Sequence, residues 1–381
     1  MSVAQTHSRS IDFLLEKAGP VIRYRLQKEL LQNLSPSEEE ALLEQITRLP
    51  AFQLVQSYVK PDGYIGRGMH SWDHWRGQTL HETPFQDGEC AARLLSYYRI
   101  PKTHPMVSNF VAALRDEAVL REEFSYIPPE IPRFEKRFLG LNSGNCLMAL
   151  VYTLQAMLGY GDDIEELRGF QEICLQGFRQ AGAIASLEEI THYNPRLKRK
   201  YNVPYIEADT YFPNLYTLAT LAYTRSWRTR ENIDLLARSL NHINAVMKPD
   251  NEMQIRIAGK FSGPCFALAR PLRPFDVNVI DTIAYRRPLS EIAMTGAGDQ
   301  VEIIRQSVTA IEEALQEDGI LRMNLQQPHN KRYSPLKLPS HPTAYTDVRL
   351  ETEDSSPTAL ACDLTFWAVE LLFLVERGGF T

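Results

Sequence analysis

Apolar side chains recur along most of the chain at the three- and four-residue spacing of helices. The clearest case is the segment 144–159, where leucines and a valine keep this spacing up to Gly159. Similar patterns predict helices over 10–34, 36–48, 88–98, 105–124, 164–181, 210–227, 230–247, 298–317 and 357–377. Alternating patterns typical of strands are scarce. The sequence therefore predicts an all-α protein.

The predicted helices are of two kinds. The segments GECAARLLSYYRI, GNCLMALVYTLQAMLGY and LACDLTFWAVELLFLVERGG are apolar almost all round, as buried helices are, whereas RDEAVLREEF and DDIEELRGF carry charge on one face. Such alternation over the chain predicts an α/α toroid, a closed ring of about six inner helices inside about six outer ones. An open helical solenoid would give the same alternation. The connectors do not resemble flexible linkers, so we expect a single toroid domain over residues 1–381.

Composition excludes several classes of partner. Of the 381 residues 44% are hydrophobic, and the net charge of -6 gives no broad positive field, so nucleic acid is not expected. The most apolar segment follows Leu360, but Asp363 and Glu370 interrupt it, so no transmembrane segment is expected. Five dispersed cysteines without a CxxC motif and the lack of a signal peptide predict a cytoplasmic protein. The oligomeric state is left open.

Several segments repeat a common pattern. QSYVKPDGYIG at 56–66 and LQEDGI at 315–320 both place Asp-Gly after a glutamine, and GNCLMALVYTLQAMLGYGDD, DLTFWAVELLFLVERGG and GPVIRYRLQKELL have a related helical character. Together they resemble the terpenoid cyclase and protein prenyltransferase superfamily of α/α toroids, especially bacterial proteins with prenyltransferase and squalene-cyclase-like repeats. The resemblance implies a toroid whose central cavity binds or transforms an apolar, isoprenoid-type small molecule.

The two standard sites of that superfamily have no counterpart in the sequence. A class II terpene cyclase uses a DxDD sequence, which is absent here. The shorter GDD sequence at 161–163 is typical of a helix cap. The zinc ligands of the protein prenyltransferases have no clear equivalents. We therefore expect no metal and no cofactor, and the sequence leaves open whether the protein is an enzyme.

The densest group of reactive side chains lies at 69–90, in MHSWDHWRGQTLHETPFQDGEC. In a toroid this connector would lie at the mouth of the ring. His81, Glu82 and Asp87 are the predicted catalytic residues, as a base with orienting carboxylates. Predicted substrate-binding residues in this segment are His70, Trp72, Asp73, His74, Trp75, Glu89 and Cys90. The alternative is a polar loop whose tryptophans cover the edge of the core.

Polar residues also occupy the openings of later inner helices. Asn142, Asn145, Asp209, Tyr211 and Asn214 would either bind substrate at the mouth of the ring or cap the helices. Cys90 stands at such an opening too, where a helix N-terminus would favour a thiolate, although buried packing is the favoured role for it.

Three functions remain open at this point. The leading one is a toroid that binds or transforms an isoprenoid-type ligand. The second is an α/α-toroid carbohydrate hydrolase or lyase, in which His81, Glu82, Asp87, Asp209 and Tyr211 would perform the acid-base chemistry. The third is a noncatalytic binding scaffold. An enclosed apolar cavity favours the first, a groove lined by carboxylates the second, and a filled ring the third.

Overall fold

The computed structural model describes most of the chain and is mainly helical. The described residues are 2–68, 86–123, 146–194, 196, 198, 203–207, 210, 212–247, 254–257, 259–262, 272–277, 286–322, 350–351 and 356–379. Within them the structure has the helices α1 to α15 and one short three-stranded sheet. The prediction of an all-α protein is confirmed.

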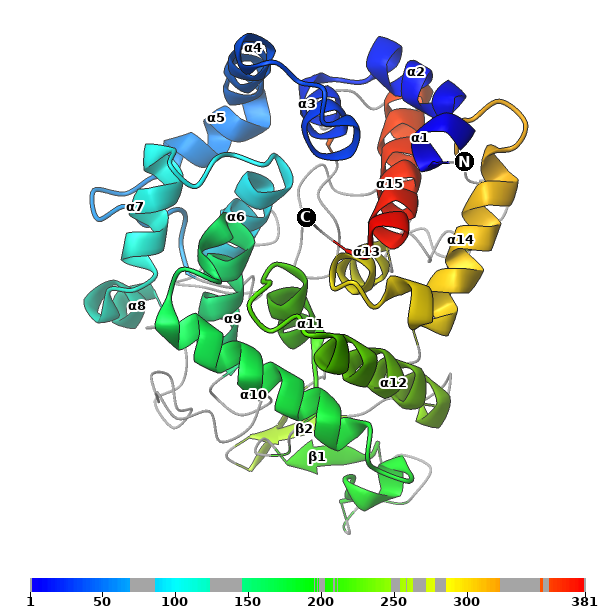
Figure 1. Ribbon diagram of the computed structural model, residues 1–381. Helices are drawn as coiled ribbons and strands as arrows, with labels where there is room; N and C mark the ends of the chain where they lie inside the picture. The colour runs from blue at the N-terminus through cyan, green and yellow to red at the C-terminus, as the bar shows by residue number, and fades with distance from the viewer. Residues whose placement is uncertain are drawn as a thin grey trace.

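A set of buried helices stands side by side around the middle of the molecule (Figure 1). These central helices are α3 (Pro20–Arg25), α6 (Gly88–Tyr97), α9 (Cys146–Gln155), α11 (Leu215–Ala222), α13 (Arg286–Met294) and α15 (Pro357–Arg377). The π-helical turns η1 (Leu26–Leu31) and η3 (Ala156–Tyr160) continue α3 and α9. Contacts connect them in the order α6, α9, α11, α13, α15, α3.

The remaining helices lie outside this set. These peripheral helices are α1 (Val3–Thr6), α2 (Ser8–Lys17), α4 (Pro36–Thr47), α5 (Pro50–Ser57), α7 (Pro105–Ala113), α8 (Glu117–Glu123), α10 (Glu165–Ala181), α12 (Arg230–Val246) and α14 (Glu302–Leu315). Two 3₁₀ turns lie in the connections: η4 (Leu187–Glu189) follows α10, and η7 (Gly298–Gln300) precedes α14. Helix α2 packs on α15, α4 on α3, and α10 on α11. These peripheral helices thus cover central ones with their apolar faces.

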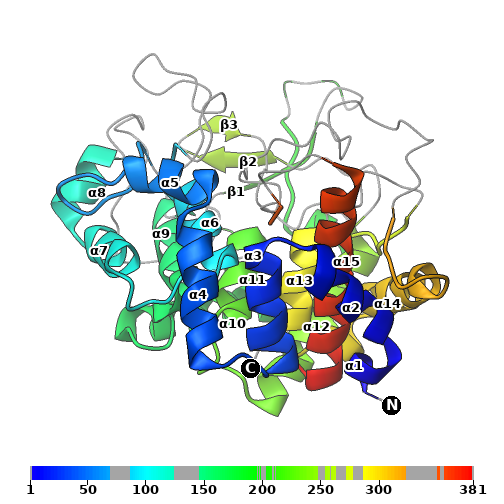
Figure 2. The ribbon, with the colours of Figure 1, turned by 90° about the horizontal axis from the view of Figure 1, so that it is seen from above.

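The sheet lies at one end of the helices, and both chain termini lie at the opposite end (Figure 2). Strand β1 (Tyr205–Glu207) pairs in parallel with β2 (Gln254–Ile257), which pairs antiparallel with β3 (Lys260–Ser262). The first residues of α15 lie at the sheet end and its last residues at the end of the termini (Figure 2).

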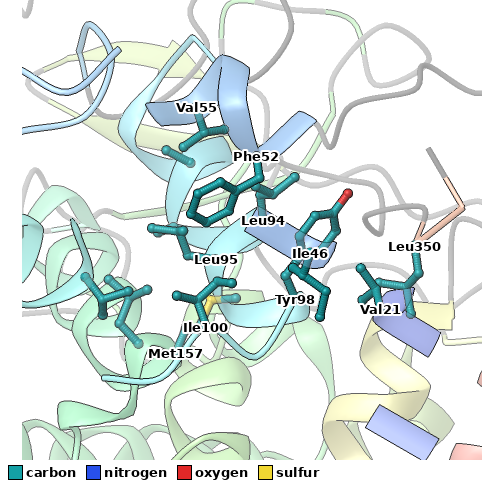
Figure 3. Close-up of a cluster of buried hydrophobic side chains, with 14 of the residues drawn as sticks. Val21, Ile46, Phe52, Val55, Leu94, Leu95, Tyr98, Ile100, Met157 and Leu350 are labelled. Atoms are coloured by element: carbon teal, nitrogen blue, oxygen red, sulfur yellow. The ribbon is translucent and has the colours of Figure 1, made fainter. Parts of the chain in front are cut away.

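Two clusters of buried side chains form the core, and α15 contributes to both. In the first, Phe52 of α5 lies against Leu94 and Leu95 of α6 (Figure 3). Leu150 and Leu154 of α9 and Trp367 and Leu371 of α15 are all buried, as the sequence predicts for these two apolar helices. The side chain of Leu147, predicted to join them, lies outside what the structure describes.

Among the described helices, α15 has the length and apolar composition to cross a membrane, but 72% of its most apolar stretch is buried inside the protein. Asp363 accepts a hydrogen bond from the backbone N–H of Leu350, and Glu370 forms an ion pair with Arg25. Both acidic residues therefore have partners within the protein, and α15 is a helix of the core.

The two Asp-Gly pairs noted in the sequence form the same turn. Gly63 has φ +86° and Gly319 has φ +79°, in the left-handed region that favours glycine. In each turn the aspartate Oδ1 accepts the backbone N–H two residues on, from Tyr64 at 2.9 Å and from Ile320 at 3.0 Å. A repeated sequence pattern thus produces a repeated local structure.

The structure differs from the helix prediction in several places. The helix expected over 105–124 is divided into α7 and α8, and the one expected over 210–227 is reduced to α11. The helix expected over 10–34 is interrupted at Ala18 and Gly19, because Pro20 lacks an N–H and starts a new helix as its first residue. Helix α5 and helix α13 were not predicted. The small sheet was not predicted either, because its strands are three or four residues long.

Candidate functional site

Most of the predicted site residues lie outside the described part of the chain. These are His70, Trp72, Asp73, His74, Trp75, His81, Glu82, Asn142, Asn145, Asp209 and Tyr211. The structure describes the other four, Asp87, Glu89, Cys90 and Asn214, and all four are buried.

Asp87 and Cys90 form the start of α6. Asp87 is the N-cap, and its Oδ1 accepts the backbone N–H of Cys90 at 2.7 Å. Burial and the nearby charges of Asp87 and Glu89 raise the pKa of the Cys90 thiol well above its ordinary value. The helix N-terminus therefore does not produce a thiolate here, and packing is the role that the structure gives to Cys90.

Asn214 has the equivalent position in α11. Its Oδ1 accepts the backbone N–H groups of Tyr216 at 2.9 Å and Thr217 at 3.0 Å, and Asn214 is the N-cap of the helix. Of the two roles considered for this residue, the structure shows the capping one.

Glu89 joins two central helices. Its Oε1 accepts hydrogen bonds from Nε of Arg93 at 2.9 Å and from Nη2 at 2.7 Å, one turn further along α6. Its Oε2 accepts the hydroxyl of Tyr216, on α11, at 3.1 Å. Arg93 and Glu89 are 0% and 1% exposed. This is an ion pair in the protein interior, where an unpaired charge would be strongly unfavourable.

A second pair of the same spacing lies on α13. Nε of Arg287 donates to Oε1 of Glu291 at 2.7 Å, and both side chains are buried. Burial and the positive charge of Arg93 oppose the charged form of Arg287, but Glu291 outweighs them and its pKa is raised. The pKa of Arg93 is raised well above its ordinary value, because Glu89 and Glu291 outweigh the effect of its burial. The two pairs therefore interact electrostatically inside the molecule.

A third group of charges lies where α3 continues into η1. Arg25 bonds to Glu29 at 3.3 Å on its own helix and forms an ion pair with Glu370 of α15. Nε of Arg99, which follows α6, donates to the other oxygen of Glu29 at 2.6 Å. Burial alone would raise the pKa of Glu29, but Arg99 and Arg25 lower it below its ordinary value. These bonds link α3 to both α6 and α15.

Together these charged residues form what we call the axial charge cluster. Its members are Arg25, Glu29, Glu89, Arg93, Arg99, Arg287, Glu291, Asp363 and Glu370. Positive and negative groups nearly balance, as they must in a site with little water. The cluster was not predicted, because charges on a helix usually mark its solvent face.

A small cavity lies beside the cluster. Its lining residues are Arg25, Tyr97, Arg99, Tyr223, Arg287, Ser290, Glu291, Met294, Leu350, Asp363, Phe366, Trp367 and Glu370. The cavity volume of about 60 Å³ is enough for about four water molecules. Burial raises the pKa of Tyr223, so its hydroxyl stays protonated and can donate a hydrogen bond. The lining is suited to water or a small polar group and leaves no room for an isoprenoid chain.

The described residues contain no group of three or more His, Cys, Asp or Glu side chains that could hold a metal ion. His70 and His74 lie outside those residues.

Comparison with known proteins gives no match: neither a family model, nor a curated protein, nor a solved structure is similar to this chain. The resemblance to terpenoid cyclases and prenyltransferases therefore stays a prediction that rests on the quoted segments.

Proposed function

We propose that the chain is an α/α toroid. The order of contacts among the central helices supports this, because it runs from α6 through α9, α11, α13 and α15 to α3. The ion pair between Glu29 and Arg99 then connects the end of α3 back to the end of α6. Peripheral helices cover the central ones, as the outer ring of a toroid does. The repeated Asp-Gly turns are a further sign of a repeat architecture.

We also propose that this toroid acts on a polar ligand of the carbohydrate class, the second of the three functions considered from the sequence. One observation favours a polar ligand over an isoprenoid: the middle of the described structure contains the axial charge cluster and a cavity of only about 60 Å³. An isoprenoid would need an empty, apolar middle, since a hydrocarbon offers no hydrogen bonds to the charged side chains that line the cavity. The described residues offer no such space.

In this proposal the ligand binds at the end where α6 and α11 begin. The bond between Glu89 and Tyr216 ties these two helices together within their first turns, two residues after each N-cap. The predicted acid and base, His81 and Glu82, precede α6 in sequence. They would protonate the leaving oxygen and activate water in a hydrolase, or remove a proton beside a uronate carboxylate in a lyase. The described cysteines Cys90, Cys174 and Cys362 are free, which is compatible with the proposed cytoplasmic location.

The test is an activity assay of the purified full chain on a panel of neutral and uronate-containing oligosaccharides. Release of reducing ends reports hydrolysis, and ultraviolet absorbance of an unsaturated uronate reports a lyase. We expect one of these signals, and we expect His81→Ala and Glu82→Gln to abolish it with unchanged circular dichroism. Native mass spectrometry of the same preparation reports any retained lipid. A stoichiometric isoprenoid without activity on any sugar would overturn the proposal.

A noncatalytic binding scaffold is the second candidate, because the nearly filled middle of the molecule favours it. The same panel of oligosaccharides distinguishes the two candidates. A scaffold would bind an oligosaccharide in calorimetry without changing it chemically, and so would its His81→Ala variant.

A further inference from the structure

A second hollow lies at the end of the molecule opposite the sheet, where α15 ends (Figure 2). It is formed by the last turns of η1 and α15 and by Arg225, which follows α11. We call it the terminus-end pocket. Its volume is about 330 Å³, within the range of small-molecule sites. The ligand of the proposed function binds where α6 and α11 begin, so a pocket beyond the end of α11 is independent of that function.

Three positively charged side chains from distant parts of the chain line this pocket. They are Lys28, Arg225 and Arg377, and all three are exposed, so a dissolved molecule reaches them. Like charges around one hollow repel one another, and an anion between them would relieve the repulsion. The nearby Arg228 responds to this charge: burial and the positive charge of Arg225 lower its pKa to about 10.

The carboxylates that line the pocket are already neutralised by the axial charge cluster. Glu29 accepts hydrogen bonds from Arg25 at 3.3 Å and from Arg99 at 2.6 Å. Glu370 forms an ion pair with Arg25. These bonds leave the positive charges of the pocket in excess, which favours a negatively charged ligand.

Arg377 is held in a fixed orientation. Its Nη1 donates to the backbone oxygen of Glu29 at 2.8 Å, and its Nη2 donates to that of Leu30. Its guanidinium lies over the ring of Phe373, 4.9 Å from the centroid. A guanidinium has further N–H groups beyond these two, and its planar shape matches a carboxylate or a phosphate. Little side-chain freedom is therefore lost when Arg377 binds an anion.

Lys28 and the apolar lining complete the pocket. Nζ of Lys28 donates to the hydroxyl of Tyr24 at 2.7 Å and to Glu39 at 2.5 Å, and an ammonium group has one more N–H to donate. Phe373 and Leu374 of α15 supply apolar surface beside these charges. The pocket thus combines donors for an acid group with a wall for a short apolar body.

We propose that the terminus-end pocket binds a small organic acid, in which a carboxylate or phosphate group is attached to a short apolar body. The acid group would lie between Lys28, Arg225 and Arg377. The body would lie against Phe373 and Leu374.

Benzoate, phenyl phosphate and benzamide test this proposal, because they share the aromatic ring and benzamide carries no charge. Ligand-observed NMR on the full chain gives the three dissociation constants. We expect at least one of the acids to bind about tenfold more tightly than benzamide, the effect of one hydrogen bond between charged groups. Salt should narrow this difference by screening the charges. Acids that bind no more tightly than benzamide, or not at all, would overturn the proposal.

Two double variants locate the binding. Lys28→Gln with Arg225→Gln should abolish the preference for acids and leave benzamide binding unchanged, and Arg225→Gln alone should weaken it about threefold. Arg48→Gln with Arg121→Gln is the matched control, because it removes the same charge from exposed side chains that do not line the pocket. Circular dichroism and thermal unfolding verify that each variant is folded. A preference for acids that survives without Lys28 and Arg225, or that the control also loses, would refute the assignment to this pocket.

Discussion

The axial charge cluster and the α9–α10 groove, a hollow of about 470 Å³ between α9 and α10, reverse the usual distribution of polarity. Arg93 and Arg287 are buried in the middle of the molecule with their carboxylates, while Met148, Tyr152 and Ile173 line a hollow on the outer side of the central helices. Charges enclosed by partners hold helices in register but leave little for a ligand to gain. Apolar side chains that line an open hollow are packed on one side only and contribute less to stability. The difference predicts that variants in the cluster change stability far more than variants in the groove.

The largest effect is expected from breaking the cluster at Glu89. Glu89→Leu leaves the buried guanidinium of Arg93 and the hydroxyl of Tyr216 without their acceptor. Loss of one partner from a buried pair costs about 3–5 kcal/mol in the free energy of unfolding. The double variant Glu89→Leu with Arg93→Met should recover most of that loss, since no unpaired charge remains. Denaturant titration measures both, and a loss below about 1 kcal/mol in the single variant would contradict the pairing.

A comparison within α9 sharpens the contrast between its two faces. Leu150 is 2% exposed in the core, whereas Met148 is half-buried at the groove. Leu150→Ala should lower the free energy of unfolding by about 2–5 kcal/mol, because a cavity remains in tightly packed surroundings. Met148→Ala is the matched control and should lose less than half as much. Equal losses in denaturant titration would mean that the groove face is packed as firmly as the core face.

Acid should weaken the cluster through Glu29. The pKa of this carboxyl in the folded protein is below its ordinary value of 4.5, because Arg99 and Arg25 outweigh its burial. Its ionised form therefore contributes stability that is fully present above pH 4.5 and is lost as the pH falls through the lower folded pKa. Glu29→Gln should flatten the fall of the unfolding midpoint in acid. The exposed Glu44 is the control, and an unchanged acid dependence in Glu29→Gln would be inconsistent with this account.

The smallest effect concerns Asp87, which the sequence predicted to be catalytic. As the N-cap of α6 it should lose about 1 kcal/mol of stability in Asp87→Ala, whereas Asp87→Asn keeps the acceptor and should be nearly neutral. Thermal unfolding distinguishes the two variants. Full stability of Asp87→Ala would show that the cap contributes nothing and would return the residue to the catalytic candidates.

The sequence predicted the helices well, because apolar spacing depends only on neighbouring residues. The break at Gly19 and Pro20 was visible in the sequence, but the apolar spacing continues across it and masks the boundary. Helix α13 was missed because RRPLSEIAM reads as polar. In the structure Arg287 and Glu291 of this helix face the interior, which local spacing does not reveal.

The sequence contains a pattern that indicates the axial charge cluster. Arg25 with Glu29, Glu89 with Arg93, and Arg287 with Glu291 share the same four-residue spacing on three central helices. On α6, which is otherwise apolar, such a pair indicates a buried ion pair, because no solvent face remains for it. The α9–α10 groove could not be predicted, since it depends on how two helices and the end of a third meet in space.

The ion pair between Arg25 and Glu370 joins residues near the two ends of the chain, and α2 packs along α15 in the same region. A ribosome makes the chain from the N-terminus, so the first helices are complete long before their partner emerges. Their apolar faces stay uncovered until α15 leaves the exit tunnel. Contacts so distant in sequence form slowly, so the growing chain exposes these apolar faces to aggregation until α15 is released.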